Sequence, residues 1–284
     1  MEHRGPGFAS PTRPVIVDAP QALLDLTRAQ APHWPEAAGA DNAVHVTALT
    51  ADDGSVRFTA SSYDAPDVVL PSGLLAANGL IGTVIGAFVA ADPEWICLHA
   101  AAVAISPVDP SGLTVLLGDT MAGKSTLAMA LVEAGARLWC DDRLPLSDDM
   151  QGMALGLRPK LRLPLPDSAP ASFTAFVEAR GTAREGSMVY LAPSEQAQAA
   201  FGEVLPVRRL ITLARSPQPQ APKLTQGGIA ETVKHLVPVT FAPHLDPMTR
   251  LTRLRQVASA CECLHLTYGD SFEAAEFLMQ ELDE

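Results

Sequence analysis

The stretch from Gly118 to Ser125 has the residue types and spacing of a loop that binds nucleotide phosphates. It reads GDTMAGKS and fits the pattern G-x-x-x-x-G-K-[ST] at every fixed position. Glycine at Gly118 and Gly123 permits backbone angles that a side chain would block, so the loop N–H groups can turn inward around phosphates. Lys124 is then expected to reach the β- and γ-phosphates, and the Ser125 hydroxyl is expected to bind Mg²⁺.

Two adjacent carboxylates, Asp141 and Asp142, follow a short distance along the chain. One carboxylate at such a site can hold Mg²⁺, directly or through water. The second can take a proton from an attacking hydroxyl group. The alternative is that Asp142 caps the next turn and Asp141 is a solvated acid, and the residues alone leave both interpretations open.

A strand, a helix and a second strand are expected to position these groups. Residues 113–117 form a short apolar run that is typical of a buried strand. A helix should follow the loop, point its positive N-terminus at the phosphates and end at Gly135; its apolar residues recur at helical spacing, at Leu127, Ala128, Ala130, Leu131 and Ala134. Residues 137–140 should form a strand that carries the carboxylates to the sheet edge where ligands collect. A glycine turn before an ordinary amphipathic helix is the alternative.

This arrangement resembles the catalytic domain of the HPr kinase/phosphorylase family and its bacterial relatives. That family carries an Arg-Leu-apolar-apolar-Asp-Asp stretch similar to residues 137–142, and a Leu-His element on the preceding strand, similar to Leu98-His99. The resemblance covers residues 95–142 well and continues weakly to the C-terminus, where residues 159–163 are similar to a Pro-x-Leu-Arg-Leu segment of the relatives. It implies a kinase that phosphorylates a serine of a protein or peptide with ATP and Mg²⁺, and it suggests a homo-oligomer.

The resemblance also implies roles for individual residues. Lys124 and Ser125 would bind phosphate and metal, Asp141 would accept the proton, Asp142 would be a metal partner, and His99 would be an active-site histidine. The whole loop would hold the nucleotide: Gly118, Asp119, Thr120, Met121, Ala122, Gly123, Lys124, Ser125 and Thr126.

The chain departs from the classical members of the family in two places. It has Thr120-Met121 where they have Ser-Gly, and it lacks the glycine-rich signature that follows their paired aspartates. The reverse, phosphate-removing reaction and HPr itself as the substrate are therefore not predicted.

Further cationic residues are candidates for binding anions. Arg215 ends the expected strand 207–214, on the ligand edge if that strand is parallel, and is a candidate for charge stabilisation during the reaction. Arg158, Lys160 and Arg162 would share one face of a strand, which would suit an acidic peptide or a transferring phosphate. The alternative for these three is a solvated edge strand.

The composition limits the classes of partner. The 284 residues carry a net charge of −12, which disfavours binding to nucleic acid and to anionic membranes. The four cysteines form no C-x-x-C pair, and the N-terminus has no apolar signal segment, so we expect a cytoplasmic protein. Residues 73–91 are apolar enough to consider a membrane span, but we expect a buried helix there.

The sequence therefore predicts an α/β protein, with a P-loop kinase domain of the HPr kinase type over residues 92–284. Residues 21–91 should form a small α+β region, and residues 1–20, with four prolines, a flexible arm. The predicted function is an ATP- and Mg²⁺-dependent serine kinase. The alternatives are a small-molecule kinase, or a nucleotide-gated module that binds a peptide with little turnover.

Overall fold

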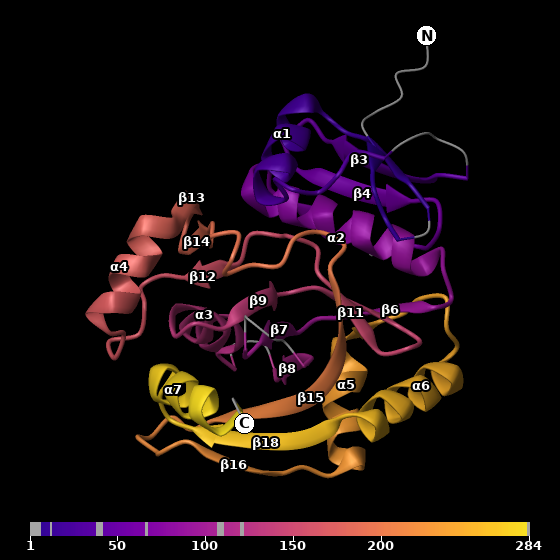
Figure 1. The fold of residues 1–284 in the computed structure, drawn as a ribbon. Helices are drawn as coiled ribbons and strands as arrows, with labels where there is room; N and C mark the ends of the chain where they lie inside the picture. Colours follow the sequence, from indigo (N-terminus) through magenta and orange to yellow (C-terminus); the bar gives the residue numbers. More distant parts are fainter. Residues whose placement is uncertain are drawn as a thin grey trace. The chain divides into compact units, whose positions relative to one another are not determined.

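The computed structural model describes residues 7–11, 13–37, 42–65, 68–106, 111–119 and 122–282. It has a mixed α/β fold in two compact units (Figure 1). Unit 1 is formed by Met1–Cys97 together with Phe241–Asp246, and unit 2 by Leu98–Thr240 together with Pro247–Glu284. The boundary predicted after residue 91 lies close to this division, whereas the return of segment 241–246 to unit 1 has no local pattern, because it depends on contacts between distant parts of the chain.

Unit 1 contains a five-stranded sheet and two helices. The strands lie in the order β1-β2-β3-β4-β5, with bounds Gly7–Phe8, Val15–Asp18, Val44–Thr50, Val56–Ala60 and Val69–Leu70. β3 and β4 pair antiparallel and form a hairpin. Residues 7–8 and 15–18, which we expected in a flexible arm, form strands instead, since Val15 and Val17 are buried and β2 pairs in parallel with β3.

The helices of unit 1 are α1 (Gln21–Gln30) and α2 (Leu74–Ala90). α2 is the apolar helix that the sequence predicted, and most of its residues are buried. It has 17 residues, and no helix in the described part of the chain is long and apolar enough to cross a membrane.

Unit 2 is built around a large sheet that contains the run β10-β11-β15-β8-β7-β9, with β18 beside β15 and β16 beside β18. These strands have the bounds Leu144–Ser147 (β10), Gln151–Met153 (β11), Val204–Arg215 (β15), Leu113–Leu117 (β8), Ala101–Ala104 (β7), Arg137–Cys140 (β9), Glu262–Tyr268 (β18) and Lys223–Gln226 (β16). A separate sheet, β12-β14-β13, comprises Lys160–Arg162, Met188–Leu191 and Gly181–Glu185. The chain passes between the units near β6 (Trp95–Leu98) and β17 (Thr240–Phe241).

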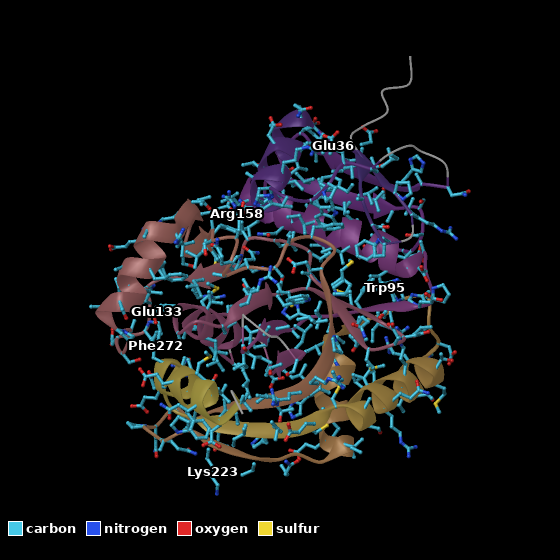
Figure 2. The ribbon with its side chains drawn as sticks, viewed as in Figure 1. Glu36, Trp95, Glu133, Arg158, Lys223 and Phe272 are labelled. Carbon is cyan, nitrogen blue, oxygen red and sulfur yellow. The ribbon has the colours of Figure 1, made fainter. Side chains whose placement is uncertain are left out.

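The helices of unit 2 cover both faces of the large sheet. They are α3 (Lys124–Glu133), α4 (Ala171–Arg180), α5 (Ile229–Val239), α6 (Pro247–Ala260) and α7 (Ser271–Leu282). α3 and α7 lie side by side over one face and share an apolar core with it. Phe272 in the first turn of α7, labelled in Figure 2, packs against Phe173 of α4 with 4.8 Å between the ring centroids. α5 and α6 pack together against β15 and β18 (Figure 1).

Strand directions bring four loops of unit 2 to one edge of the sheet. β15 pairs in parallel with both β8 and β18. β7 pairs antiparallel with both β8 and β9, so β9 runs in the same direction as β8. The segments that follow β8, β9, β15 and β18 therefore emerge at the same edge, where open α/β sheets bind their ligands.

Two segments of unit 2 depend on contacts that have no local pattern in the sequence. His99 and Ala100 separate β6 from β7, which places His99 close to the start of β7, at the same edge of the sheet. Residues 223–226 form β16 although they are mostly polar, because pairing with β18 satisfies their backbone groups.

Candidate functional site

The loop after β8 joins a fully buried strand to α3, as the motif requires. Gly123 has a φ of 90°, the left-handed region that glycine favours. At Gly118 the constraint is packing rather than backbone conformation, because a Cβ on this residue would lie 3.0 Å from the Cβ of Ala122. Thr120 and Met121 lie outside the described residues.

Lys124 is folded back onto the loop that precedes it. Its Nζ donates hydrogen bonds to the carbonyl oxygens of Gly118, at 2.8 Å, and Asp119, at 3.1 Å. Burial lowers the pKa of Lys124, and the nearby carboxylates of Asp142 and Asp141 oppose that shift. The ammonium group thus lies between the loop and the acid pair, where it can neutralise phosphate charge.

Tyr268, at the end of β18, holds the loop from the other side. Its ring is fully buried, and its hydroxyl donates to the carbonyl oxygen of Ala122 at 2.8 Å. Burial raises the pKa of Tyr268 to about 12, so the hydroxyl keeps its proton at neutral pH. A Cβ on Gly123 would lie 3.1 Å from the Tyr268 hydroxyl oxygen, which gives this glycine a packing role besides its conformational one.

Asp141 is a buried carboxylate with incomplete hydrogen bonding. Its Oδ2 accepts the backbone N–H of Lys160 at 3.0 Å, whereas its Oδ1 is buried and has no hydrogen-bond partner among the described residues. Burial raises the pKa of Asp141, and the Ser125 hydroxyl and the Lys160 N–H oppose that shift. A carboxyl group with a raised pKa binds a proton more readily than an exposed one, as a general base requires.

Asp142 is surrounded by cationic side chains. Its Oδ2 lies 3.2 Å from the Nζ of Lys160 and 3.7 Å from the Nε of Arg143, and its Oδ1 lies 3.2 Å from the Nε2 of His99. Burial would raise the pKa of Asp142, but Lys160, Arg143 and His99 outweigh it, and the pKa is lowered. Asp142 is therefore the carboxylate that stays ionised, as a metal ligand must.

His99 lies beside Asp142, with 3.2 Å between its Nε2 and the Asp142 Oδ1. Burial lowers its pKa, and the ion pair with Asp142 opposes that shift. Its backbone N–H donates to the carbonyl oxygen of Val239 at 2.7 Å, which fixes the segment between β6 and β7.

The structure brings most of the predicted residues together but places Arg215 apart from the acid pair. Lys124, Asp141, Asp142 and His99 form one interacting group. Arg215 ends β15, which is parallel to β8, and lines a pocket on the opposite side of the loop.

Two residues of this site were absent from our predicted set. Lys160 contacts both carboxylates, through its N–H and its ammonium group, and Tyr268 contacts the loop. The alternation of Arg158, Lys160 and Arg162 singled out Lys160 as an anion-binding candidate but did not indicate that it pairs with Asp142. No local sequence pattern indicates that Tyr268 contacts the loop, since it is similar to the other apolar residues of its strand, β18.

The donor groups fit ATP with Mg²⁺. Mg²⁺ on a nucleotide is usually held by one or two protein oxygens together with phosphates and water, and Asp142 and Ser125 could supply such oxygens. The described residues contain no cluster of three or more His, Cys, Asp or Glu that could hold a metal ion.

Comparisons with known proteins give a distant likeness to solved structures. No family model matches the chain, and no curated protein matches it. Among solved structures, the chain is similar to the HPr(Ser) kinase/phosphatase from Coxiella burnetii, at 14% sequence identity, with 66% of this chain and 93% of that chain covered and a TM-score of 0.33. This likeness is too distant to carry an argument about function, which must rest on the site itself.

Proposed function

We propose that the protein is an ATP- and Mg²⁺-dependent kinase that transfers the γ-phosphoryl group to a serine hydroxyl of a protein or peptide. The observation that carries this proposal is the opposite environment of two adjacent carboxylates beside the loop. One is buried with a raised pKa, and the other is paired with cations and has a lowered pKa. Carboxylates whose pKa values are pushed apart are typical of a site that needs a base and an ionised ligand at once.

In this proposal each residue of the site has a separate role in phosphoryl transfer. The loop N–H groups and Lys124 hold the phosphates, Asp142 and Ser125 hold the metal, and Asp141 faces the acceptor. When bound, Mg²⁺ neutralises charge on the phosphates and helps to align them. Asp141 takes the proton of the serine hydroxyl as the serine oxygen bonds to the γ-phosphorus and the bond to the β-phosphate bridging oxygen breaks.

Cationic side chains beside the acid pair support a phosphoryl-transfer site. Lys160 and His99 contact Asp142 directly, and Arg143 lies within 3.7 Å of it. Binding of Mg²⁺ at Asp142 would free Lys160 to contact the transferring phosphoryl group. His99 would then keep the remaining oxygen of Asp142 in place.

An acceptor screen tests the proposal. The protein would be incubated with ATP, Mg²⁺ and a mixed peptide library in which serine is the only hydroxyl-bearing residue, and phosphate gain would be measured by mass spectrometry. A matched library with alanine for serine is the control, and a set of small hydroxy compounds tests the small-molecule alternative. Phosphate gain in the serine library alone supports the proposal. Gain on small compounds alone, or ATP binding without any transfer, contradicts it and favours the small-molecule kinase or the binding module.

A further inference from the structure

The strand β12 lies directly beside the acid pair. The backbone N–H of Lys160 donates to the Oδ2 of Asp141 at 3.0 Å, and the Nζ of Lys160 lies 3.2 Å from the Oδ2 of Asp142. Asp141 is the proposed base, so the acceptor hydroxyl must come within hydrogen-bonding reach of its carboxylate. A peptide that brings a serine to Asp141 therefore passes close to β12.

The two faces of β12 have different surroundings. Side chains alternate between the faces of a strand, so Lys160 and Arg162 share one face and Leu161 lies on the other. Leu161 is 1% exposed and belongs to the apolar core of unit 2. The ammonium group of Lys160 reaches Asp142, and Arg162 is exposed. The face that carries Arg162 is therefore the face turned towards the acid pair.

Two arginines of this segment have no acidic partner. Arg162 forms no ion pair and no side-chain hydrogen bond within the part of the chain that the structure describes. The Nε of Arg158, two residues before Lys160, is buried and has no hydrogen-bond partner there either. Burial lowers the pKa of Arg158, and no neighbouring carboxylate opposes that shift. Because charged groups withdrawn from water are normally paired, these arginines suit an anion that a ligand supplies.

The position of Arg162 distinguishes between the two anions that this face could bind. The transferring phosphoryl group is confined to the space between the phosphate loop and the acid pair. Arg162 lies two residues beyond Lys160, which is about 7 Å along an extended strand. Residues of an extended peptide have the same spacing, so a carboxylate two residues from the acceptor serine suits Arg162. An acidic residue of the acceptor therefore fits Arg162 better than the phosphoryl group does.

We propose that the acceptor is an acidic peptide segment in which carboxylates flank the serine, with Arg162 binding one carboxylate and Arg158 a second. The inference rests on the proposed function, since it places the serine at Asp141. The chain carries a net charge of −12, so a cationic face beside the acid pair would attract and orient an acidic segment that the rest of the surface repels.

Phosphate transfer to a peptide library with varied charge tests this inference. Each peptide has one serine, with glutamate, glutamine or lysine at each of the two positions on either side of it. The library would be incubated with the wild-type protein and Mg²⁺–ATP, and the phosphorylated members would be identified by mass spectrometry. We expect glutamate to be enriched at least fivefold over glutamine in at least one flanking position, as one ion pair at a partly exposed site allows, and lysine to be depleted.

Reversal of charge on the two faces of the small sheet locates the contact. Arg162→Glu should lose the preference for glutamate and should favour lysine at the same position. Arg184→Glu is the matched control, because Arg184 is exposed on β13 of the same sheet but lies on the opposite face: it pairs with Val189, which also pairs with Leu161. Arg184→Glu should keep the wild-type preference.

Other outcomes separate failure of the inference from failure of the function. Transfer to serine without enrichment of glutamate overturns the inference although the protein is a kinase, and so does an unchanged preference in Arg162→Glu. If no member of the library gains phosphate, the proposed function is wrong and the inference falls with it. Binding of Mg²⁺–ATP, measured by calorimetry, shows that each variant is folded. If Arg162→Glu does not fold, Arg162→Gln takes its place, and glutamate and glutamine should then be used equally at that position.

Discussion

Asp141 and Asp142 are neighbours in the chain, yet burial raises the pKa of Asp141 while Lys160, Arg143 and His99 hold the pKa of Asp142 low. The difference arises from the backbone, because successive side chains at the end of β9 point in different directions. One carboxylate turns into the protein beneath the Lys160 N–H, and the other turns towards the cations. This single step along the chain places two carboxylates with opposite pKa shifts side by side, as the proposed base and metal ligand require.

Asp141→Asn should abolish transfer but stabilise the fold at neutral pH. Burial opposes the ionised form of Asp141 and so raises its pKa in the folded protein. Asp141 therefore stabilises the folded state at a pH below its unfolded-state pKa, and this stabilisation is lost as the pH rises through its folded-state pKa. The neutral amide avoids the penalty. We expect a rise in Tm of a few °C at pH 7–8, since about 1 kcal/mol shifts Tm by roughly 2–4 °C in a chain of this size.

The gain in stability from Asp141→Asn should disappear as the pH is lowered and wild-type Asp141 becomes protonated. Calorimetric unfolding of both proteins from pH 4 to pH 8 measures this trend. Asp142→Asn is the matched control, since it removes a carboxylate that cations stabilise and should lower Tm at neutral pH. A lower Tm for Asp141→Asn at neutral pH would contradict the assigned environment.

Lys124→Ala should reduce transfer by at least about a hundredfold, the usual cost of losing one preorganised charge-stabilising group. The Lys124 ammonium contacts the loop carbonyl oxygens and lies near both carboxylates, so its removal takes the positive charge away from the loop itself. Steady-state transfer from ATP measures the loss. Lys234→Ala, on the surface helix α5, is the control and should retain activity.

Lys160→Met should lower the Mg²⁺ concentration that is needed for half-maximal activity and should also slow transfer. Lys160 forms an ion pair with Asp142 at 3.2 Å, and removal of this competing cation leaves the carboxylate free for metal. An effect of about 1 kcal/mol, or roughly fivefold, is appropriate for a partly exposed pair. Arg162→Met, on the same strand but without contact to Asp142 in the described ion pairs, should leave the Mg²⁺ requirement unchanged. An increased Mg²⁺ requirement in Lys160→Met would show that Lys160 does not compete with the metal.

Tyr268→Phe should raise the KM for ATP more than it lowers kcat. The substitution keeps the buried ring and removes the hydrogen bond to the Ala122 carbonyl oxygen, which is worth about 0.5–1.5 kcal/mol. The loop should then hold the phosphates less firmly. Trp139→Phe removes a buried hydrogen bond of the same kind, which goes to the Gly152 carbonyl oxygen of β11 rather than to the loop. It should lower Tm without a change in KM, and an equal rise in KM for both variants would mean that Tyr268 has only a structural role.

The sequence predicted the parts of the site that depend on local pattern. The loop, its flanking strand and helix, and the strand before Asp141 all have short-range signals in residue type and spacing. The contacts of Lys160 and Tyr268 depend on segments that come together only in the folded chain. The same holds for β16 and for the segment 241–246 that joins unit 1.

The most direct test of the central claim is phosphate transfer to the serine peptide library by wild-type protein and Asp141→Asn, measured in parallel by mass spectrometry. The proposed mechanism predicts a gain of one phosphate on serine with the wild type and none with Asp141→Asn, although both bind Mg²⁺–ATP. Transfer by Asp141→Asn at the wild-type rate would contradict the role of Asp141 as the base. Binding of ATP by the wild type without transfer to any serine would contradict the kinase itself.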